Sequence, residues 1–304
     1  MRFGSLLLTL GWIGCSGESQ PNSETESRLP VVYSLSYPVS YLVDKLAGER
    51  VDNTCVLPEG EDPAVWKPST ELIISMQQAD LLVSNGLNYE VWVKTTALPT
   101  SKLVNASKSV DPIKSEGKTH SHGKGGAHSH GELDAHSWMN TAEYTMMAQA
   151  VSTALSGLND DLKTQPLDEL LAELKKIEAR RRSILTLMTE VSFAANHPAY
   201  SYMMRDAGLT IQNFDIDPEA PLSPELQQEL TTWAAGHPNP VLFWEAEPIK
   251  VITDALPMFI HQFVDPLEQP VDGGYDYIKA SHDNNARFEA LWKKIQAHTE
   301  GVAP

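Results

Sequence analysis

The chain of 304 residues is 41% hydrophobic, and its length exceeds the ~250–300 residues at which single cores stop growing, so we expect two units. The formal net charge of −17 argues against nucleic acid and against an anionic membrane face as binding partners. The chain has two cysteines, Cys15 and Cys55. If Cys15 is lipidated, Cys55 is the only other cysteine, and the count excludes both a disulfide framework and a CxxC metal site.

The first fifteen residues have the layout of an export signal. A positive residue, an apolar run and a small residue precede Cys15, which predicts a signal peptide over 1–15 that ends at a lipidated cysteine. Bacterial lipoprotein signals usually have a leucine three residues before the cysteine, and this chain has Trp12 there. The polar, acidic residues 16–28 predict a flexible tether. Because the apolar run is shorter than the ~20 residues of a transmembrane helix, we expect an exported protein held at the membrane by a lipid anchor.

The next part of the chain alternates between strand and helix patterns. Strands are predicted at 29–37, 51–57 and 80–84, where β-branched and aromatic residues gather. Helices are predicted at 39–46 and 69–78, where apolar residues recur at helical spacing. This order favours a parallel sheet covered on both faces, and ligands of such sheets bind in loops at the carboxyl ends of the strands.

Half of the ten histidines lie between residues 118 and 140. Four of them sit among glycine, lysine and serine without an apolar period, which predicts an auxiliary chelating loop: His120, His122, His128 and His130. His136 differs, because Leu133, Trp138 and Met139 can anchor it to a core. Neutral imidazole is a ligand for zinc, copper, nickel and iron(II), so we expect His136 to be a fixed metal ligand. A solvated linker with incidental metal affinity is the alternative.

Two helices follow the histidines. One is predicted at 141–158, and the second begins after Thr164, the candidate N-cap, with Pro166 in its first turn. The apolar period of the second helix continues for roughly 25 residues, or about 37 Å. We interpret 161–190 as a helix that joins two lobes. An ordinary surface helix of a single domain is the alternative.

Strand patterns then resume at 191–195, 209–216, 241–244 and 258–264. His197 and Asp265 each follow one of these strands, and each precedes a proline that turns the chain. Together with His136 they would form a mixed nitrogen and oxygen metal site between the lobes. Loop hydrogen bonding is the alternative role of each. Structural or solvated roles are expected for the remaining histidines: His237, His261, His282 and His298.

Several short motifs gain specificity from their order and spacing: Tyr33-Ser-Leu-Ser-Tyr-Pro38, Pro58-Glu-Gly-Glu-Asp-Pro63, Ala79-Asp-Leu-Leu-Val-Ser-Asn-Gly86, Asp134-Ala-His-Ser-Trp138, His197 with Ala199-Tyr200, and Asp265-Pro-Leu267. Through them, residues 30–297 resemble the substrate-binding proteins of bacterial zinc and manganese ABC transporters. The resemblance implies an α/β fold of two lobes, each with a mainly parallel sheet flanked by helices, joined by one long backbone helix. The corresponding ranges are 29–160 for the first lobe, 161–190 for the helix and 191–304 for the second lobe.

The resemblance also implies ligand roles. His136, His197 and Asp265 match three ligand positions of the family, and a His-rich loop before the second position is similar to its zinc-preferring branch. The family's usual Asp-Pro-His reads Asp-Pro-Ala here, with Ala64 in place of the first ligand. Glu61 is our candidate for a fourth ligand, and another loop carboxylate, a loop histidine or water are alternatives. If histidines bind the metal, affinity should fall as the pH drops through about 6.5.

The resemblance therefore implies a binding protein, not an enzyme, that captures a transition metal and delivers it to an ABC permease and its ATPase, and we expect it to be a monomer. Zinc is the first choice of ligand, and Mn²⁺, Fe²⁺ or Ni²⁺ are alternatives because mixed nitrogen and oxygen sites follow one affinity order. A secreted zinc hydrolase could also use three ligands and a water, but the chain has no His-Glu-x-x-His or Gly-x-Ser-x-Gly motif. A metal-buffering or adhesive surface lipoprotein without a transporter is the third hypothesis.

Overall fold

A computed structural model describes residues 1, 28–63, 65–114, 120–121, 127–128, 133–159, 162, 165–270 and 274–299. Cys15 and almost all of the predicted signal peptide and tether lie outside these residues, as do Ala64 and Thr164. Within the described part of the chain, no helix combines the length and the apolar character needed to cross a membrane.

The first half of the chain folds around a four-stranded parallel sheet. Its strands are β1 (Val31–Ser34), β2 (Asp52–Cys55), β3 (Leu81–Ser84) and β4 (Leu103–Asn105), in the spatial order β2-β1-β3-β4. The connecting helices are α1 (Tyr37–Ala47) and α2 (Thr70–Gln78), with short 3-10 turns η1 (Gly48–Arg50) and η2 (Val91–Thr95). Pro38 stands in the first turn of α1, and Gly48 ends it at φ 56°, where residues other than glycine are disfavoured.

The second half of the chain repeats this arrangement with another parallel sheet. Its strands are β7 (Ser192–Ala195), β8 (Ile211–Asn213), β9 (Pro240–Trp244) and β10 (Ile260–Phe263), in the order β10-β9-β7-β8. The helices between them are α5 (Ser201–Asp206), α6 (Pro224–Ala235) and α7 (Lys250–Ala255). The predicted α/β fold with two mainly parallel sheets is therefore confirmed.

Both faces of each sheet are buried, and alternate residues of a strand enter different cores. Leu81 and Val83 of β3 belong to a large core, whereas Leu82 between them belongs to a smaller core on the other face. Likewise, Val241 of β9 faces the large core and Leu242 the opposite one. The large core contains residues of both sheets, so it joins the two lobes while each lobe keeps an outer core of its own.

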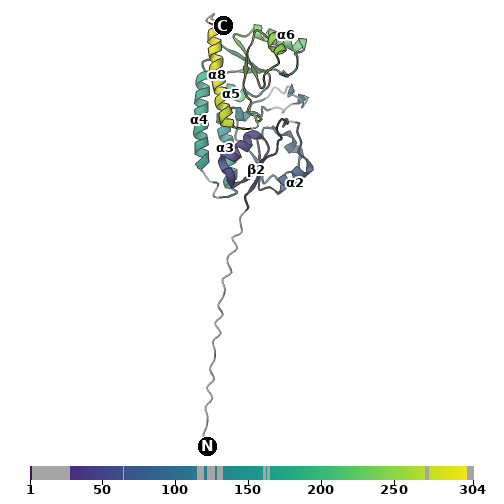
Figure 1. Cartoon of the computed structure of the whole chain (residues 1–304), viewed down its shortest axis with the longest axis vertical. Helices are drawn as coiled ribbons and strands as arrows, with labels where there is room; N and C mark the ends of the chain where they lie inside the picture. Colours follow the sequence, from purple (N-terminus) through teal and green to yellow (C-terminus); the bar gives the residue numbers. More distant parts are fainter. Residues whose placement is uncertain are drawn as a thin grey trace.

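Three helices line the shared core: α3 (Thr141–Ser156), α4 (Gln165–Leu185) and α8 (Tyr277–Thr299). Figure 1 shows α4 and α8 side by side along one flank of the molecule, with the two sheets toward opposite ends. The 21 residues of α4 correspond to about 32 Å of helix. It packs against both α3 and α8, the position expected of a helix that joins two lobes.

The limits of the predicted elements agree with the structure to within a few residues, but β4, α5, α6 and α7 were not predicted. Helix α6 has 12 residues, with Ser223 as its N-cap and Pro224 in its first turn, so its start was readable and was missed. β4 has only three residues, too few to show an alternation. The lobe boundaries at 160/161 and 190/191 stay predictions, and the strands of the two sheets lie on opposite sides of them.

Candidate metal centre

His136 lies in an irregular segment between an isolated β-bridge at Leu133 and the 3-10 turn η4 (Ser137–Met139). Trp138 and Met139 are fully buried, and His136 itself is 1% exposed. The ring of Tyr89 meets Trp138 edge-on, with ring centroids 4.7 Å apart. The anchoring of His136 that Trp138 and Met139 predicted is therefore confirmed.

One carboxylate sets the direction of the His136 ring. Asp134 Oδ1 accepts hydrogen bonds from the His136 backbone N–H and from its Nδ1, each at 2.9 Å. Since a carboxylate can only accept, Nδ1 carries a proton, and Nε2 faces away from Asp134.

His197 reaches the same point from the second lobe. It follows β7 in the turn that Pro198 enforces, as the sequence predicted, and it is 1% exposed. Its Nε2 lies 3.1 Å from Nε2 of His136, and the two rings are perpendicular with centroids 4.8 Å apart. Two imidazole nitrogens from separate halves of the chain thus face each other.

Glu268 supplies an oxygen from a third segment, the turn after β10. Its Oε1 lies 2.8 Å from Nε2 of His136 and 3.4 Å from Nε2 of His197, and its side chain is 16% exposed. Leu267 before it has φ 56°, a left-handed conformation that is rare for a residue other than glycine. Hydrogen bonds support this turn, because Leu267 N–H donates to Asp265 Oδ1 and Tyr275 O–H donates to the Leu267 carbonyl, each at 2.8 Å.

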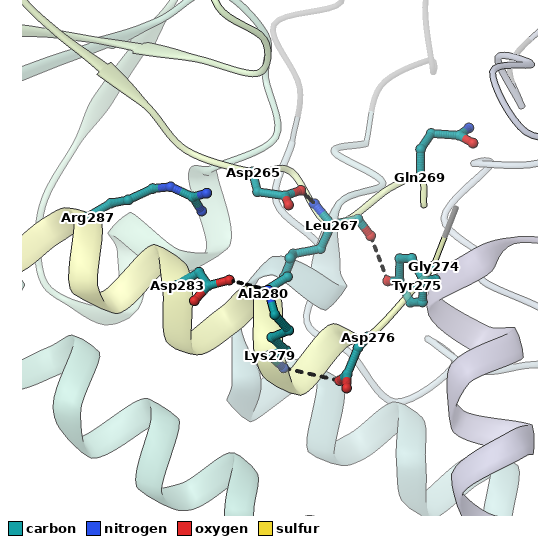
Figure 2. Close-up of a pocket in the computed structure, with 10 residues that line it drawn as sticks. All are labelled: Asp265, Leu267, Gln269, Gly274, Tyr275, Asp276, Lys279, Ala280, Asp283 and Arg287. Atoms are coloured by element: carbon teal, nitrogen blue, oxygen red, sulfur yellow. Dashed lines mark hydrogen bonds and ion pairs between the residues drawn. The ribbon is translucent and has the colours of Figure 1, made fainter. Parts of the chain in front are cut away.

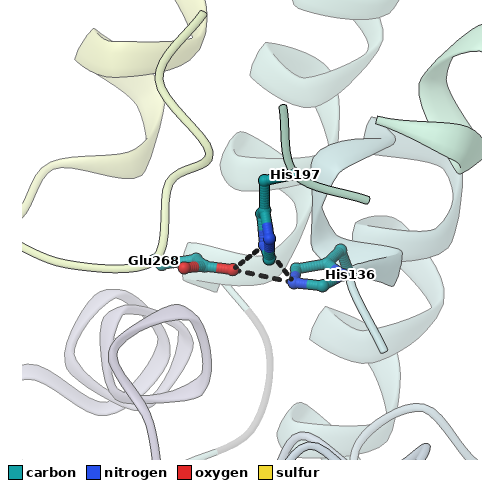
Figure 3. Close-up of side chains that lie close together, drawn as sticks. All are labelled: His136, His197 and Glu268. Atoms are coloured by element: carbon teal, nitrogen blue, oxygen red, sulfur yellow. Dashed lines mark hydrogen bonds and ion pairs between the residues drawn. The ribbon is translucent and has the colours of Figure 1, made fainter. Parts of the chain in front are cut away.

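Figure 3 shows the three side chains pointing toward one another. In the part of the chain that the structure describes, His136, His197 and Glu268 form the one group whose donor atoms, all within 4.8 Å of each other, could hold a single metal ion. Two nitrogens and one carboxylate oxygen in a buried position match the donor set of a zinc site that keeps a fourth position for water or another group.

The charges of the group are coupled in the metal-free chain. Burial lowers the pKa of His136, but the hydrogen bonds to Asp134 and Glu268 outweigh it and raise the pKa from 6.5 to about 10. For Glu268, burial raises the pKa, whereas the hydrogen bonds from His136 and His197 hold it well below its ordinary 4.5. A protonated imidazole therefore faces a carboxylate, and a divalent cation can take the place of that proton.

Asp265, the carboxylate that the sequence analysis selected, has a different position. It does follow β10, but it is not one of the described residues whose donors gather at the centre. Its Oδ1 accepts from the backbone of Leu267, and its side chain borders a pocket of about 580 Å³ against α8 (Figure 2). Its role as a ligand stays a prediction, as does that of Glu61, whose side chain is exposed.

Sequence reasoning missed Glu268. The available signal was a second carboxylate three residues after Asp265 in the same turn, at the carboxyl end of a strand. Local patterns could not decide which of these two carboxylates faces the histidines, because their directions depend on the left-handed backbone of Leu267, which lies between them.

The His-rich segment is described only in part. β5 (His120–Ser121) and β6 (Ala127–His128) pair antiparallel, which places His120 opposite His128 along the backbone. His122 and His130 lie outside the described residues. The auxiliary site predicted for these four histidines therefore stays a prediction.

Three of the other histidines have hydrogen-bonding partners away from the metal centre, which fits the structural roles expected of them. His261 accepts from Trp244 Nε1 at 3.0 Å and lies 3.1 Å from the Leu256 carbonyl, and burial lowers its pKa. His237 Nδ1 lies 2.6 Å from the Trp233 carbonyl of α6, and His282 Nε2 lies 2.9 Å from Glu173 Oε1 of α4. The side chain of His298 lies outside the described part.

The chain matches a known protein family and is similar to individual zinc-uptake and zinc-binding proteins. Residues 31–290 match the family described as zinc-uptake complex component A, periplasmic (ZnuA). The chain is 23% identical over 256 residues to the high-affinity zinc uptake system protein ZnuA of Bacillus subtilis (strain 168), which covers 80% of each protein. It is 23% identical over 296 residues to the zinc-binding lipoprotein AdcA of Streptococcus pneumoniae (serotype 4), covering 91% of this chain but 58% of that protein.

A solved structure adds evidence on the fold. The metal-dependent lipoprotein YcdH of Bacillus subtilis matches with a TM-score of 0.73 at 22% identity, over 88% of this chain and 98% of that one. The chain thus shares its fold with that lipoprotein, although it spans little more than half the length of the pneumococcal relative. Because the family match runs from the start of β1 into α8, this chain belongs to the family of periplasmic zinc-uptake complex component A proteins.

Proposed function

We propose that this protein captures one transition-metal ion, in the first place zinc, outside the cytoplasm and delivers it to an ABC permease and its ATPase. The observation that carries the proposal is the convergence of His136, His197 and Glu268, from three distant segments, on one buried point between the lobes. Asp265 is the alternative carboxylate ligand, and Glu61 or water is the alternative fourth ligand.

The donor set favours zinc over harder ions. Manganese, magnesium and calcium suit sites built from carboxylate, carbonyl and water oxygens, whereas two imidazoles favour zinc, nickel, copper or iron. The zinc-related names of the Bacillus subtilis and pneumococcal relatives support zinc as the cargo. Mn²⁺, Fe²⁺ and Ni²⁺ are the competing ions that a binding experiment must include.

The setting of the protein follows from the family. Its members are transport components and not enzymes, so nothing favours the hydrolase hypothesis. A periplasmic family description and a relative named as a lipoprotein support a location outside the cytoplasm, with a lipid at Cys15 as the proposed membrane anchor. We propose that the protein acts as a monomer beside the permease.

Native mass spectrometry of the mature protein, with equimolar zinc, manganese, iron(II) and nickel, tests the proposal. We expect one tightly bound zinc ion that survives dilution, together with weaker additional ions. Deleting residues 118–130 should remove the weaker ions and leave the tight one, because His136, His197 and Glu268 all lie outside the deleted segment. Absence of any tightly bound transition metal would overturn the proposal.

The pH dependence of binding should extend above the ordinary histidine range. The metal-free chain holds a proton on His136 up to a pKa of about 10, and zinc must displace it from Nε2. Affinity should therefore fall by about tenfold for each pH unit lost below that pKa, and about one proton should be released per zinc at about pH 8. This places the loss of affinity well above the value of about 6.5 that an ordinary histidine predicts.

Calorimetric zinc titrations in buffers of different ionisation enthalpy measure the released protons directly. Glu268 contributes no proton over this range, because its pKa is held well below 4.5. Zero protons released at about pH 8 would contradict the charge state assigned to His136.

One glutamine ties the loop of the first lobe to the turn that carries Glu268. Gly60 N–H donates to Gln269 Oε1 at 3.3 Å, and Gln269 Nε2 donates to the Glu61 carbonyl at 2.9 Å. Gln269→Ala should speed zinc release about three- to tenfold, because it removes two exposed hydrogen bonds worth about 1 kcal/mol in total. Stopped-flow transfer of zinc to a chelator measures the rate.

Gln227→Ala is the matched control for this rate. Gln227 also donates to a backbone carbonyl, that of Ala255 at 3.3 Å, but both residues lie in the second lobe. The control should release zinc at the wild-type rate. Equal rates for the two variants would show that the Gln269 bridge does not restrain release.

A further inference from the structure

Each of the two clustered histidines has a carboxylate on the side of the ring opposite the metal centre. For His136 this is Asp134, whose side chain is 3% exposed. Asp134 is itself fixed, because its N–H donates to the Ile113 carbonyl at 2.9 Å and its own carbonyl accepts from Tyr202 O–H at 3.0 Å. The Asp134 carboxylate therefore has little freedom to leave Nδ1.

For His197 the corresponding carboxylate is Glu245, which follows β9. Glu245 Oε2 lies 3.8 Å from His197 Nδ1, and the Glu245 side chain is 14% exposed. Asn196 holds Glu245 in place through two reciprocal hydrogen bonds. Asn196 Nδ2 donates to Glu245 Oε1 at 3.2 Å, and Glu245 N–H donates to Asn196 Oδ1 at 3.0 Å. The residue that positions Glu245 is thus the chain neighbour of His197.

The two carboxylates act on the rings in the same sense. A negative charge beside Nδ1 favours the tautomer with its proton on Nδ1, which leaves the Nε2 lone pair available. The Nε2 atoms of His136 and His197 are the ones that lie 3.1 Å apart and within reach of Glu268 Oε1. Both carboxylates also add negative charge close to a bound cation, from positions that do not compete for its coordination sphere.

We propose that Glu245 is a positioning residue for His197, in the way that Asp134 is for His136, and that the pair fixes both rings as Nε2 ligands. This inference rests on the proposed function, since it concerns the same metal centre. It assigns a role to a carboxylate that does not touch the metal. Loss of either carboxylate should weaken zinc binding about 10- to 100-fold, the usual effect of removing a group that orients a metal-bound histidine.

The test compares Glu245→Gln with Glu245→Asp and Glu247→Gln. Glutamine keeps the size of the side chain and an oxygen for Asn196 but removes the charge, whereas aspartate keeps the charge. Glu247 is exposed and lies two residues further along the same loop, so Glu247→Gln is the control for a charge change nearby. Zinc affinity is measured by chelator competition, and long-range ¹H–¹⁵N spectra of zinc-loaded protein report which nitrogen of each histidine is protonated.

We expect Glu245→Gln to lose about 10- to 100-fold in zinc affinity, Glu245→Asp to recover part of it, and Glu247→Gln to bind as the wild type does. The wild-type spectra should show both histidines protonated on Nδ1. Wild-type affinity in Glu245→Gln, equal losses in the glutamine and aspartate variants, or a metal bound through Nδ1 of His197 would each overturn the role of Glu245. Failure of the wild type to bind zinc is a different result, and it would overturn the proposed function itself.

Discussion

Glu268→Gln is expected to weaken zinc binding by about 100-fold or more, which corresponds to about 2.7 kcal/mol. Glu268 is the charged oxygen donor of the cluster, 2.8 Å from His136 Nε2 and 3.4 Å from His197 Nε2. A neutral amide oxygen is a poorer ligand for a divalent ion than a carboxylate, and the variant loses the negative charge closest to the metal. Competition with a chelator of known affinity measures the change.

Asp265→Asn is the matched comparison, because it makes the same chemical change three residues earlier. Its amide oxygen can still accept the hydrogen bond from Leu267 N–H that stabilises the turn. We expect zinc affinity to fall by less than about fivefold, since the Asp265 carboxylate stabilises the turn through the hydrogen bond from Leu267 N–H. If Asp265→Asn weakens binding more than Glu268→Gln does, then Asp265 is the ligand that the family resemblance implies, and the turn must rearrange around the metal.

Arg181→Met is expected to lower the free energy of unfolding by about 3 kcal/mol or more. Arg181 lies on α4, is 2% exposed, and donates to the Met139 carbonyl at 2.6 Å and to Asn285 Oδ1 at 3.3 Å. These contacts join α4 to α8 and to the turn η4 that directly follows His136. Methionine fills much of the volume but leaves both acceptors without this donor.

The charge of Arg181 is also needed by its surroundings. Glu178, one turn earlier on α4, is partly buried and has a raised pKa, because burial and its contact with Asp206 both disfavour its charged form. Removing the guanidinium takes away a compensating positive charge beside this pair. Chemical denaturation of the metal-free protein measures the loss.

Arg182→Met provides the control for helix propensity and net charge. Arg182 is the next residue of α4 and is exposed, so its replacement should change the free energy of unfolding by no more than about 0.5 kcal/mol. Similar losses for the two variants would show that the buried contacts of Arg181 do not stabilise the joint between the helices.

Much of the fold was readable because its patterns are local. The predicted strands at 80–84 and 241–244 overlap β3 and β9, since a strand buried on both faces shows as a continuous apolar or β-branched run. The predicted strand at 51–57 overlaps the edge strand β2, whose residues are exposed or half-buried. Helix α4 showed its apolar period in the same way. Elements of three to six residues, such as β4 and α7, were not readable because so few residues do not establish a period.

Two of the three clustered side chains were also readable from local signals. Trp138 and Met139 marked His136 as anchored, and a strand followed by proline marked His197. In both cases, the information lies within a few residues of the histidine. The meeting of the two rings was not readable in this way, because only His197 follows a parallel strand, whereas His136 lies in an irregular segment before η4 of the other lobe.

The sequence by itself therefore determined the α/β class, the long helix α4 and the two histidines, because each depends on residues close together in the chain. Only the tertiary structure decided that Glu268, and not Asp265, faces the histidines. That choice depends on a left-handed Leu267, held by the Asp265 carboxylate and by the hydroxyl of Tyr275, and on Asn284 of α8, which accepts from Asp265 N–H at 3.0 Å. Tyr275 lies 8 residues after Leu267, and Asn284 lies 19 residues after Asp265, so no local pattern could place them around the turn.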